Sequence, residues 1–379
     1  KMQKISDLET PALVVYKHIV AANCKRMYDL ANSHGVILKP HFKTSKCLEV
    51  AIMLSGGTKR GIEVSTLAEA DFLAKNGFDD IIYAFPLSSH KITRCAALSE
   101  QLEKFTVFVD DPLIIQQLDK YKLKDKKWSI LVEVDVGGSR SGVQADSPLL
   151  LNLVEEIKKS DNLTFAGLYS HCGQSYGCTN QREINEVARA ATTTLLSVVE
   201  RLKTKGINCP SYGIGSTPSC SRPVPEMSKL TEWHPGNYVF NDQMQVRIGS
   251  CKEEDIACFV LTRVVSHYNK KGDIYMIINC GWTALSLHGG GDCGGRSPNS
   301  GFGFIQGHPE LKLSQMSQEH GIVRSSDQLK ELDLSRYPIG SLLRVYPDHS
   351  CGTCAMHSTF YVADQNDVII DEWTPVKGW

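Results

Sequence analysis

Three lysines follow a short apolar segment in the stretch Leu38–Lys46. A lysine amine becomes nucleophilic when it is shielded from water or lies near other cations, and it can then form an imine with an aldehyde. Enzymes that use pyridoxal 5'-phosphate hold their cofactor by such an imine. Lys39 precedes a proline at the end of the apolar segment and Lys46 begins the next helical pattern, so Lys43 is the predicted catalytic residue. A loop of solvated lysines is the alternative interpretation of this segment taken alone.

Two further segments, Gly213–Ser219 and His234–Tyr238, could bind a phosphate group between them. Glycines let the backbone approach an anion, and hydroxyl and amide N–H groups donate hydrogen bonds to phosphate oxygens. A tight structural turn is the alternative for either segment. The predicted cofactor-binding residues in these segments are Ser216, Thr217, Gly236, Asn237 and Tyr238.

The segment Pro347–His357 contains a possible metal site. Residues two apart on an extended chain point the same way, so His349 and Cys351 could bind one zinc ion through an imidazole and a thiolate. If Cys354 and His357 also bind, the site is a closed structural one; otherwise positions stay open for water and substrate, as catalysis requires. Reduced cysteines without a metal are a third interpretation. A thioredoxin-like redox pair is disfavoured because the segment does not open a helix after a strand in the required βαβ pattern.

Helical patterns alternate with short apolar runs from about residue 18 to residue 242. Such alternation is typical of parallel βα units, and eight units in this length predict a (β/α)8 TIM barrel. An open, doubly wound sheet is the second choice. Clear helical patterns cover His18–Ser33, Ala68–Lys75 and Asn180–Lys205. The predicted strands are Val36–Lys39, Gly61–Val64, Asp80–Ala84, Phe105–Val109, Ile130–Asp135, Thr164–Ser170, Ser211–Gly215 and Tyr238–Asn241.

Functional groups of TIM barrels lie at the C-terminal ends of the strands. Besides the phosphate segments, this rule brings together Lys43, Asp135, Arg140, Tyr169, His171 and Tyr176. Taken singly, each of these side chains is more typical of an ordinary core or surface position.

The pattern changes after residue 245 to strands separated by turns, which predicts a mainly antiparallel β domain. The expected domains are a barrel over 17–244 and a β domain formed by 1–16 plus 245–379, with the strand Leu13–Tyr16 assigned to the β domain. The Gly- and Ser-rich stretch Gly289–Gly303 is a predicted loop. The other predicted strands of this domain are Phe259–Asn269, Asp273–Cys280, Ser341–Tyr346, Thr359–Ala363 and Val368–Trp373.

The composition is that of a globular protein without a polymer-binding surface. The 379 residues are 42% hydrophobic and 22% charged, with a formal net charge of -1, so neither nucleic acid nor a membrane is an expected partner. The 13 cysteines are an odd number in a long chain without a secretory signal, which predicts reduced thiols and a cytoplasmic location.

Several of these motifs together resemble the fold-type III pyridoxal-phosphate family, which includes alanine racemase and metal-dependent D-threonine aldolase. Within that family the likeness is greatest to the eukaryotic D-serine dehydratases. The aldolase branch carries an acidic residue where this chain has Cys351, and many relatives carry histidine where it has Ser45. The motifs extend over most of the chain: Lys39–Lys46, Glu63–Ala70, Tyr169–Gly173, Ile214–Pro218, His234–Tyr238, Gln318–Gly321 and Pro347–Cys351.

The resemblance implies a cofactor, a metal and a reaction. It implies that Lys43 holds pyridoxal 5'-phosphate and that His349 and Cys351 bind Zn2+. It also implies a homodimer in which the loop around His288 and Asp292 could serve the neighbouring subunit. The residues that it places in contact with the cofactor are Tyr169, Tyr176, Thr217, Gly236 and Asn237.

The expected reaction is the dehydration of D-serine to pyruvate and ammonia, in which Lys43 removes the α-proton and zinc assists loss of the β-hydroxyl. Cleavage of D-threonine and dehydration of D-threo-3-hydroxyaspartate are alternatives within the same family. A non-catalytic pyridoxal-phosphate carrier is an alternative from another class; it is disfavoured because carriers of that type resemble the barrel alone.

Overall fold

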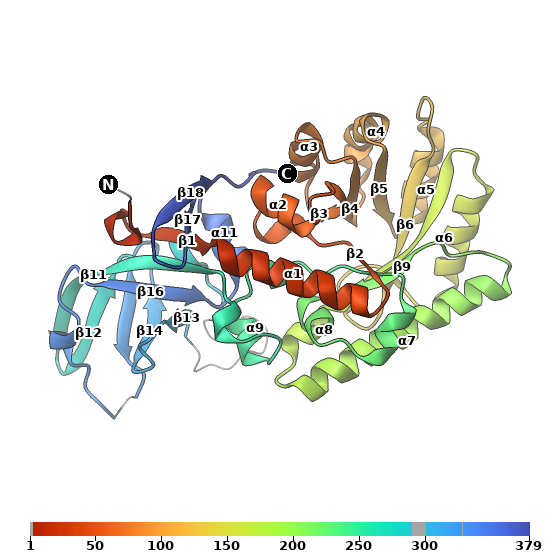
Figure 1. Ribbon diagram of the computed structural model, residues 1–379. Coiled ribbons are helices and arrows are strands. Elements are labelled where there is room, and N and C mark those ends of the chain that lie inside the picture. The colour runs from red at the N-terminus through yellow and green to blue at the C-terminus, as the bar shows by residue number, and fades with distance from the viewer. Residues whose placement is uncertain (1–2, 290–300, 328) are drawn as a thin grey trace. The chain divides into compact units, whose positions relative to one another are not determined.

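The computed structural model describes residues 3–289, 301–327 and 329–379 (Figure 1). The chain divides into two compact units. The barrel unit contains Cys24–Tyr238 and Val376–Trp379, and the β unit contains Lys1–Asn23 and Val239–Pro375. Within the described ranges, no helix is both long enough and apolar enough to cross a membrane.

The barrel unit contains an eight-stranded parallel sheet in the order β2-β10-β9-β8-β6-β5-β4-β3. The two end strands are joined where the backbone N–H of Glu63 donates to the carbonyl of Pro40 at 3.0 Å, beside an isolated bridge between His41 and Glu63. The predicted barrel is therefore confirmed. Its strands are β2 (Ile37–Leu38), β3 (Arg60–Val64), β4 (Asp80–Pro86), β5 (Lys104–Val109), β6 (Trp128–Asp135), β8 (Leu163–His171), β9 (Tyr212–Gly215) and β10 (Glu232–Trp233), with β7 (Val143–Gln144) paired to β6.

Helices follow most of these strands, and side-chain caps fix where several of them begin. In α7 the Asn180 side chain accepts from the backbone N–H of Glu183 at 3.0 Å, and the buried Ile184, Ala188 and Ala191 repeat at helical spacing along one face. The helices are α1 (Lys17–Ser33), α2 (Leu48–Leu54), α3 (Leu67–Lys75), α4 (Ile92–Gln101), α5 (Pro112–Lys120), α6 (Pro148–Lys159), α7 (Gln181–Thr204) and α8 (Thr217–Ser221). Short 3-10 helices in this unit are η2 (Phe42–Thr44), η3 (Ser89–Lys91), η4 (Gly173–Gly177) and η5 (Pro225–Lys229).

One predicted barrel strand is wrong. Tyr238–Asn241 is not a strand; the 3-10 helix η6 (Asn237–Val239) lies there, and the eighth strand is β10, six residues earlier in the sequence. The apolar run around Val239 is buried on all sides, so its composition does not distinguish a strand from a helical turn. The strand that the structure has instead, β10, is two residues long and too short to show an alternation of apolar and polar residues. As a result, His234–Tyr238 follows the C-terminal end of the eighth strand.

The β unit is a nine-stranded sheet whose main path runs β14-β15-β12-β11-β1-β17-β18. All its pairs are antiparallel except β1 with β17, and β1 pairs with both β11 and β17, so the assignment of Leu13–Tyr16 to this sheet is confirmed. Val14, Phe259 and Leu261 lie in its core. The strands are β1 (Ala12–Tyr16), β11 (Cys258–Lys270), β12 (Asp273–Ile278), β13 (Gly303–Ile305), β14 (Leu311–Met316), β15 (Gly321–Ser325), β16 (Leu342–Pro347), β17 (Phe360–Ala363) and β18 (Ile369–Trp373).

The sequence patterns did not predict β13, β14 and β15, and most of the predicted loop Gly289–Gly303 lies outside the described residues. The β unit also has short helical segments, of which α9 and α11 matter for the site. They are α9 (Gln243–Arg247), α10 (Trp282–Leu285) and α11 (Ser350–Met356), with the 3-10 helices η1 (Ile5–Asp7), η7 (Glu253–Asp255) and η8 (Leu334–Arg336).

Candidate active site

The three lysines of the Leu38–Lys46 segment have different surroundings. The Nζ of Lys39 lies 2.5 Å from a carboxylate oxygen of Glu232, and the Nζ of Lys46 lies 2.9 Å from a carboxylate oxygen of Glu69. Both carboxylates are buried. Lys43 lies on η2 and lines a cavity instead. The structure therefore gives ion pairs to the two outer lysines and directs the middle one at a space large enough for a ligand.

That cavity has a volume of about 390 Å³, within the usual range for small-molecule sites. Its walls come from the C-terminal ends of β4, β6 and β8 and from the segments that follow β2, β3 and β6, as expected for a TIM barrel. The predicted residues Lys43 and Tyr169 meet here, together with Arg140 and His171. Its lining residues are His41, Lys43, Ser65, Ala84, Phe85, Pro86, Glu133, Arg140, Ser141, Tyr169 and His171.

Two histidines of the cavity are held neutral. Burial lowers the pKa of His41 and of His171 well below the usual range, and the charge of Lys43 lowers each pKa further. His41 Nδ1 accepts from the backbone N–H of Lys43 at 3.3 Å, and its Nε2 lies 3.4 Å from the hydroxyl of Ser65. A neutral imidazole both donates and accepts, so these rings can orient polar groups without adding charge.

A chain of buried polar groups runs behind Tyr169. The Tyr169 hydroxyl lies 3.4 Å from one oxygen of Glu63, whose other oxygen lies 2.8 Å from Nδ1 of His234. Nε2 of His234 lies 3.8 Å from Glu232, the partner of Lys39. Burial raises the pKa of Tyr169 well above its usual range, so its phenol stays protonated and acts as a donor. The sequence motifs did not predict this chain: a charged residue inside the apolar strand β3 marks Glu63 as unusual, but nothing local identifies its partners.

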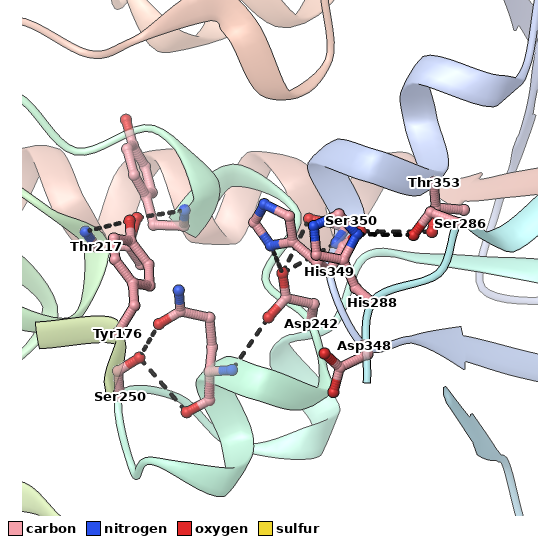
Figure 2. Close-up of polar contacts among 12 residues, drawn as sticks. Tyr176, Thr217, Asp242, Ser250, Ser286, His288, Asp348, His349, Ser350 and Thr353 are labelled. Carbon is pink, nitrogen blue, oxygen red and sulfur yellow. Dashed lines mark hydrogen bonds and ion pairs between the residues drawn. The ribbon is translucent and has the colours of Figure 1, made fainter. Parts of the chain in front are cut away.

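The phosphate segment after β9 is already arranged as a helix start. Ser216 caps α8, because its hydroxyl accepts from the backbone N–H of Ser219 at 3.3 Å, and the hydroxyl of Ser175 lies 2.9 Å from it. This side chain therefore faces the protein interior. The N–H of Thr217 donates to the hydroxyl of Tyr176 at 3.3 Å, and Figure 2 shows the two residues together. The Thr217 N–H thus donates to an oxygen, and a phosphate oxygen is an acceptor of the same kind.

The segment after β10 packs closely on the lysine segment. A Cβ on Gly236 would lie 3.0 Å from the Cβ of His41, so a larger residue there would push the two loops apart. Asn237 and Tyr238 are each 3% exposed. The backbone N–H of Tyr238 donates to the Thr217 hydroxyl at 3.0 Å, which joins the two phosphate segments. Tyr238 contributes through its backbone, since its ring is buried beside Cys24 and Cys220.

The predicted metal pair lies in the β unit, where β16 leads into α11. The prediction of an extended chain there is wrong: α11 begins at Ser350, so His349 is its N-cap residue and Cys351 lies in its first turn. The two side chains are nevertheless neighbours, because the Cys351 thiol hydrogen-bonds to His349. Burial lowers the pKa of His349, but Cys351 and the carboxylate of Asp242 outweigh this effect and raise the pKa to about 10.

The described part of the chain does not form the closed four-ligand site. The Nε2 of His357 lies 2.7 Å from the carbonyl of Ala284, and no group of three or more His, Cys, Asp or Glu side chains among the described residues is arranged to hold a metal. The centroid of the His288 ring lies 5.0 Å from that of the His349 ring. Figure 2 shows the two side chains as neighbours. Asp292, which was considered with His288, lies outside the described residues.

The donor chemistry of His349 and Cys351 fits zinc. An imidazole nitrogen and a thiolate sulfur are both preferred zinc ligands, and two protein ligands leave positions open for water or substrate. None of the twelve described cysteines, Cys351 included, forms a disulfide.

Two family models match the chain. The model for the alanine racemase N-terminal domain matches residues 17–243, and the model for a putative serine dehydratase domain matches residues 257–363. The first match corresponds to the barrel strands and the second to most of the β unit.

Individual relatives match along almost the whole chain. A D-serine dehydratase of Dictyostelium discoideum is 34% identical over 99% of this chain and 98% of its own length. A D-threo-3-hydroxyaspartate dehydratase of Delftia sp. (strain HT23) is 31% identical over 98% of each chain, and a D-threonine aldolase of Arthrobacter sp. is 28% identical over 97% of this chain and 92% of its own.

Solved structures give the same result. The D-threo-3-hydroxyaspartate dehydratase of Delftia sp. HT23 superposes with a TM-score of 0.92 at 30% identity, with all of both chains covered. One structure of that enzyme carries a histidine-to-alanine substitution, and another carries a cysteine-to-alanine substitution and is described as metal-free. The two substituted positions are two residues apart, the spacing of His349 and Cys351 here. The chain belongs to the alanine racemase family of fold-type III pyridoxal-phosphate enzymes, in the group formed by the eukaryotic D-serine dehydratases and their relatives.

Proposed function

We propose that this protein is a D-serine dehydratase that uses pyridoxal 5'-phosphate and zinc to convert D-serine to pyruvate and ammonia. The observation that carries this proposal is the placement of Lys43 in the cavity while Lys39 and Lys46 are held by buried carboxylates. The 34% identity to a D-serine dehydratase over nearly the whole chain supports the choice of substrate. A cytoplasmic homodimer that acts on a small D-amino acid is part of the same proposal.

Several groups fit the cofactor. The Lys43 amine would hold its aldehyde carbon, and the Thr217 N–H with the loop around Gly236 and Asn237 would hold its phosphate. When bound, the cofactor supplies an acceptor for the electrons that are left when the substrate loses its α-proton. Tyr169 lines the same cavity and donates its phenolic proton to Glu63, so its hydroxyl oxygen can accept a hydrogen bond from a polar group in the cavity.

Lys43 has a second role once substrate replaces it. Its amine accepts the α-proton of D-serine, since it lines the cavity and is set free when the substrate takes its place on the cofactor. His41 is fixed through its bond to the Lys43 backbone, and its lowered pKa makes its imidazole a weak base, so it competes little with the lysine amine for the proton. Arg140 lines the same cavity from the loop after β6, and its guanidinium can pair with the substrate carboxylate.

The β-hydroxyl is the difficult leaving group in this reaction. His349 and Cys351 would hold zinc, which supplies a Lewis acid for a hydroxyl oxygen and so lowers the cost of releasing it as water. The α-proton and the hydroxyl that leave the substrate together make one molecule of water. The enamine that remains takes up one water and releases ammonia, which leaves pyruvate and balances the reaction.

Two related reactions are the alternatives. The chain is 31% identical to a D-threo-3-hydroxyaspartate dehydratase and 28% identical to a D-threonine aldolase, so the same residues could serve dehydration of a hydroxyaspartate or cleavage of D-threonine. The presence of Cys351 instead of the acidic residue expected in the aldolase branch favours dehydration.

The test is a product assay on four substrates with the purified, cofactor-loaded and zinc-loaded protein. D-Serine, L-serine, D-threonine and D-threo-3-hydroxyaspartate are compared at equal concentration for the 2-oxo acid, ammonia and glycine released. The proposal predicts pyruvate and ammonia in equal amounts from D-serine and none from L-serine. Turnover of D-threonine to glycine as the fastest reaction would replace it with the aldolase assignment. A cofactor absorbance band without turnover of any substrate would favour a non-catalytic carrier.

A further inference from the structure

A buried aspartate lies directly against the predicted metal ligand His349. Asp242 follows the barrel segment in sequence but belongs to the β unit, where it caps α9 and is completely buried. Its Oδ2 lies 3.1 Å from Nδ1 of His349 (Figure 2). No sequence pattern singled this residue out, because 107 residues separate it from His349.

Two backbone amides determine what the carboxylate does. The N–H of Gln245 donates to Oδ1 of Asp242 at 3.0 Å, and the N–H of Ser350 donates to Oδ2 at 3.0 Å. A backbone N–H can only donate, so both oxygens of Asp242 serve as acceptors. The Oδ2 that faces His349 is therefore an acceptor as well, and Nδ1 must be the nitrogen that carries the hydrogen.

The tautomer decides which nitrogen can bind a metal. With the hydrogen on Nδ1, the lone pair of a neutral His349 is on Nε2. Histidines that bind metals usually donate their other ring N–H to a carboxylate or carbonyl, which fixes the ring and raises its basicity. The contact with Ser350 adds a second constraint, because Asp242 holds the backbone between the two predicted ligands as well as the ring of the first.

We propose that Asp242 is a positioning residue for the metal site. Its carboxylate holds His349 with Nδ1 protonated, so that Nε2 faces a divalent metal ion beside the Cys351 sulfur. This inference deepens the proposed function and rests on its zinc site.

The support behind Asp242 is itself fixed. The side chain of Ser250 hydrogen-bonds to the carbonyl and the side chain of Gln245, which ties the chain after α9 to the helix that Asp242 caps (Figure 2). Each carboxylate oxygen of Asp242 is thus held by a backbone N–H, Oδ1 by one in α9 and Oδ2 by one at the start of α11. This arrangement is what precise orientation of a metal ligand requires.

The first test is zinc affinity of the full-length protein after metal removal, measured by competition with a chromophoric chelator. In Asp242→Asn an NH2 group replaces one of the two acceptor oxygens. This group cannot accept a hydrogen bond, so it faces a backbone N–H or the Nδ1 hydrogen without forming one. We expect the variant to bind zinc about 10- to 100-fold more weakly than the parent. The matched control is Asp348→Asn: Asp348 is also buried and precedes His349, but its carboxylate pairs with Arg247 at 2.7 Å. The control should keep the zinc affinity of the parent within about threefold, even if it unfolds more easily.

The second test needs no variant. Nitrogen-15 NMR of the zinc-loaded parent, with labelled histidine and with His349→Ala to identify the signal, reports which ring nitrogen bears the hydrogen. The inference predicts a protonated Nδ1 and a metal-bound Nε2 for His349. This measurement decides the question if Asp242→Asn fails to fold.

The outcomes separate this inference from the zinc site itself. Equal zinc affinity in Asp242→Asn and the parent, equal losses in Asp242→Asn and Asp348→Asn, or a metal-bound Nδ1 would overturn the positioning role while the zinc site stands. A parent that binds no zinc, or one whose affinity is unchanged by His349→Ala, would overturn the zinc site and this inference together.

Discussion

The cavity of the barrel unit and the His349 turn of the β unit are built in different ways. The cavity collects one to three residues from each of several strands, and the closed parallel sheet brings them to one end of the barrel. The predicted metal ligands are instead neighbours in sequence and depend on a distant carboxylate, Asp242, for their orientation. The cavity should therefore tolerate the loss of single wall residues and fail only when the reacting amine is removed, whereas the turn should be sensitive to each of its few contacts.

The largest effect is expected at Lys43. Lys43→Ala removes both the attachment point and the proposed base, so we expect loss of the cofactor absorbance band and a loss of turnover of at least about 10³-fold. Lys46→Gln is the control, because this lysine pairs with Glu69 and should leave the absorbance band in place. Absorbance spectra and pyruvate release measure the two effects. If both survive in Lys43→Ala, the cavity is not where the cofactor is bound.

The next largest effect, that of zinc removal, would distinguish the role of the His349 turn from that of the cavity. Removal of zinc, or His349→Ala, should lower the rate of D-serine dehydration by about 100-fold or more, because the hydroxyl then leaves without Lewis-acid assistance. The cofactor absorbance band should persist, since none of the residues proposed to hold the cofactor belongs to the β unit. The readouts are pyruvate release and the absorbance spectrum, before and after zinc is restored. Full activity in the metal-free protein would make the ion structural at most.

A smaller effect concerns the buried charges behind the cavity. Glu232→Gln would leave the Lys39 ammonium largely buried without its counter-charge, and we expect the free energy of unfolding to fall by about 3–5 kcal/mol. Replacing both residues by leucine should recover most of this loss. Urea denaturation of the metal-free and cofactor-free protein measures both. An unchanged stability in Glu232→Gln would show that the ion pair does not contribute to the folded barrel.

The smallest effect is a pH dependence of stability. The folded-state pKa values of His41 and His171 lie below the value of about 6.5 in the unfolded chain, so the folded protein binds fewer protons at these sites. The contribution of these two histidines to the free energy of unfolding should therefore be largest above pH 6.5 and fall as the pH drops below it. His171→Gln should make this decline shallower. Denaturation at a series of pH values measures it, and an identical decline in variant and parent would mean that His171 does not titrate in this way. Glu63, whose pKa is raised by burial, acts in the opposite direction in both proteins and cancels in the comparison.

The difference between the two regions also explains how much could be predicted from the sequence. The barrel, seven of its eight strands and the cavity residues Lys43 and Tyr169 were predicted, because alternating βα patterns are periodic and barrel strands direct their ends to one edge. The eighth strand was missed because Glu232–Trp233 is too short to have a period. Glu63, His234 and Asp242 were missed for another reason: their roles depend on contacts between segments far apart in sequence, and no local pattern encodes these.

The spacing of His349 and Cys351 led to the right pair of neighbours by an incorrect argument. The expected extended chain is the start of α11, and the two side chains come together because a helix begins between them. A motif can thus identify residues that lie together without identifying the backbone that brings them together.

The most direct test of the central claim is to locate the covalent bond between the protein and its cofactor. Borohydride reduction of the cofactor-loaded protein makes an imine bond permanent, and peptide mass mapping then identifies the modified lysine. The account predicts the added mass on Lys43, with Lys39 and Lys46 unmodified. Modification of either outer lysine, or of none of the three, would contradict it.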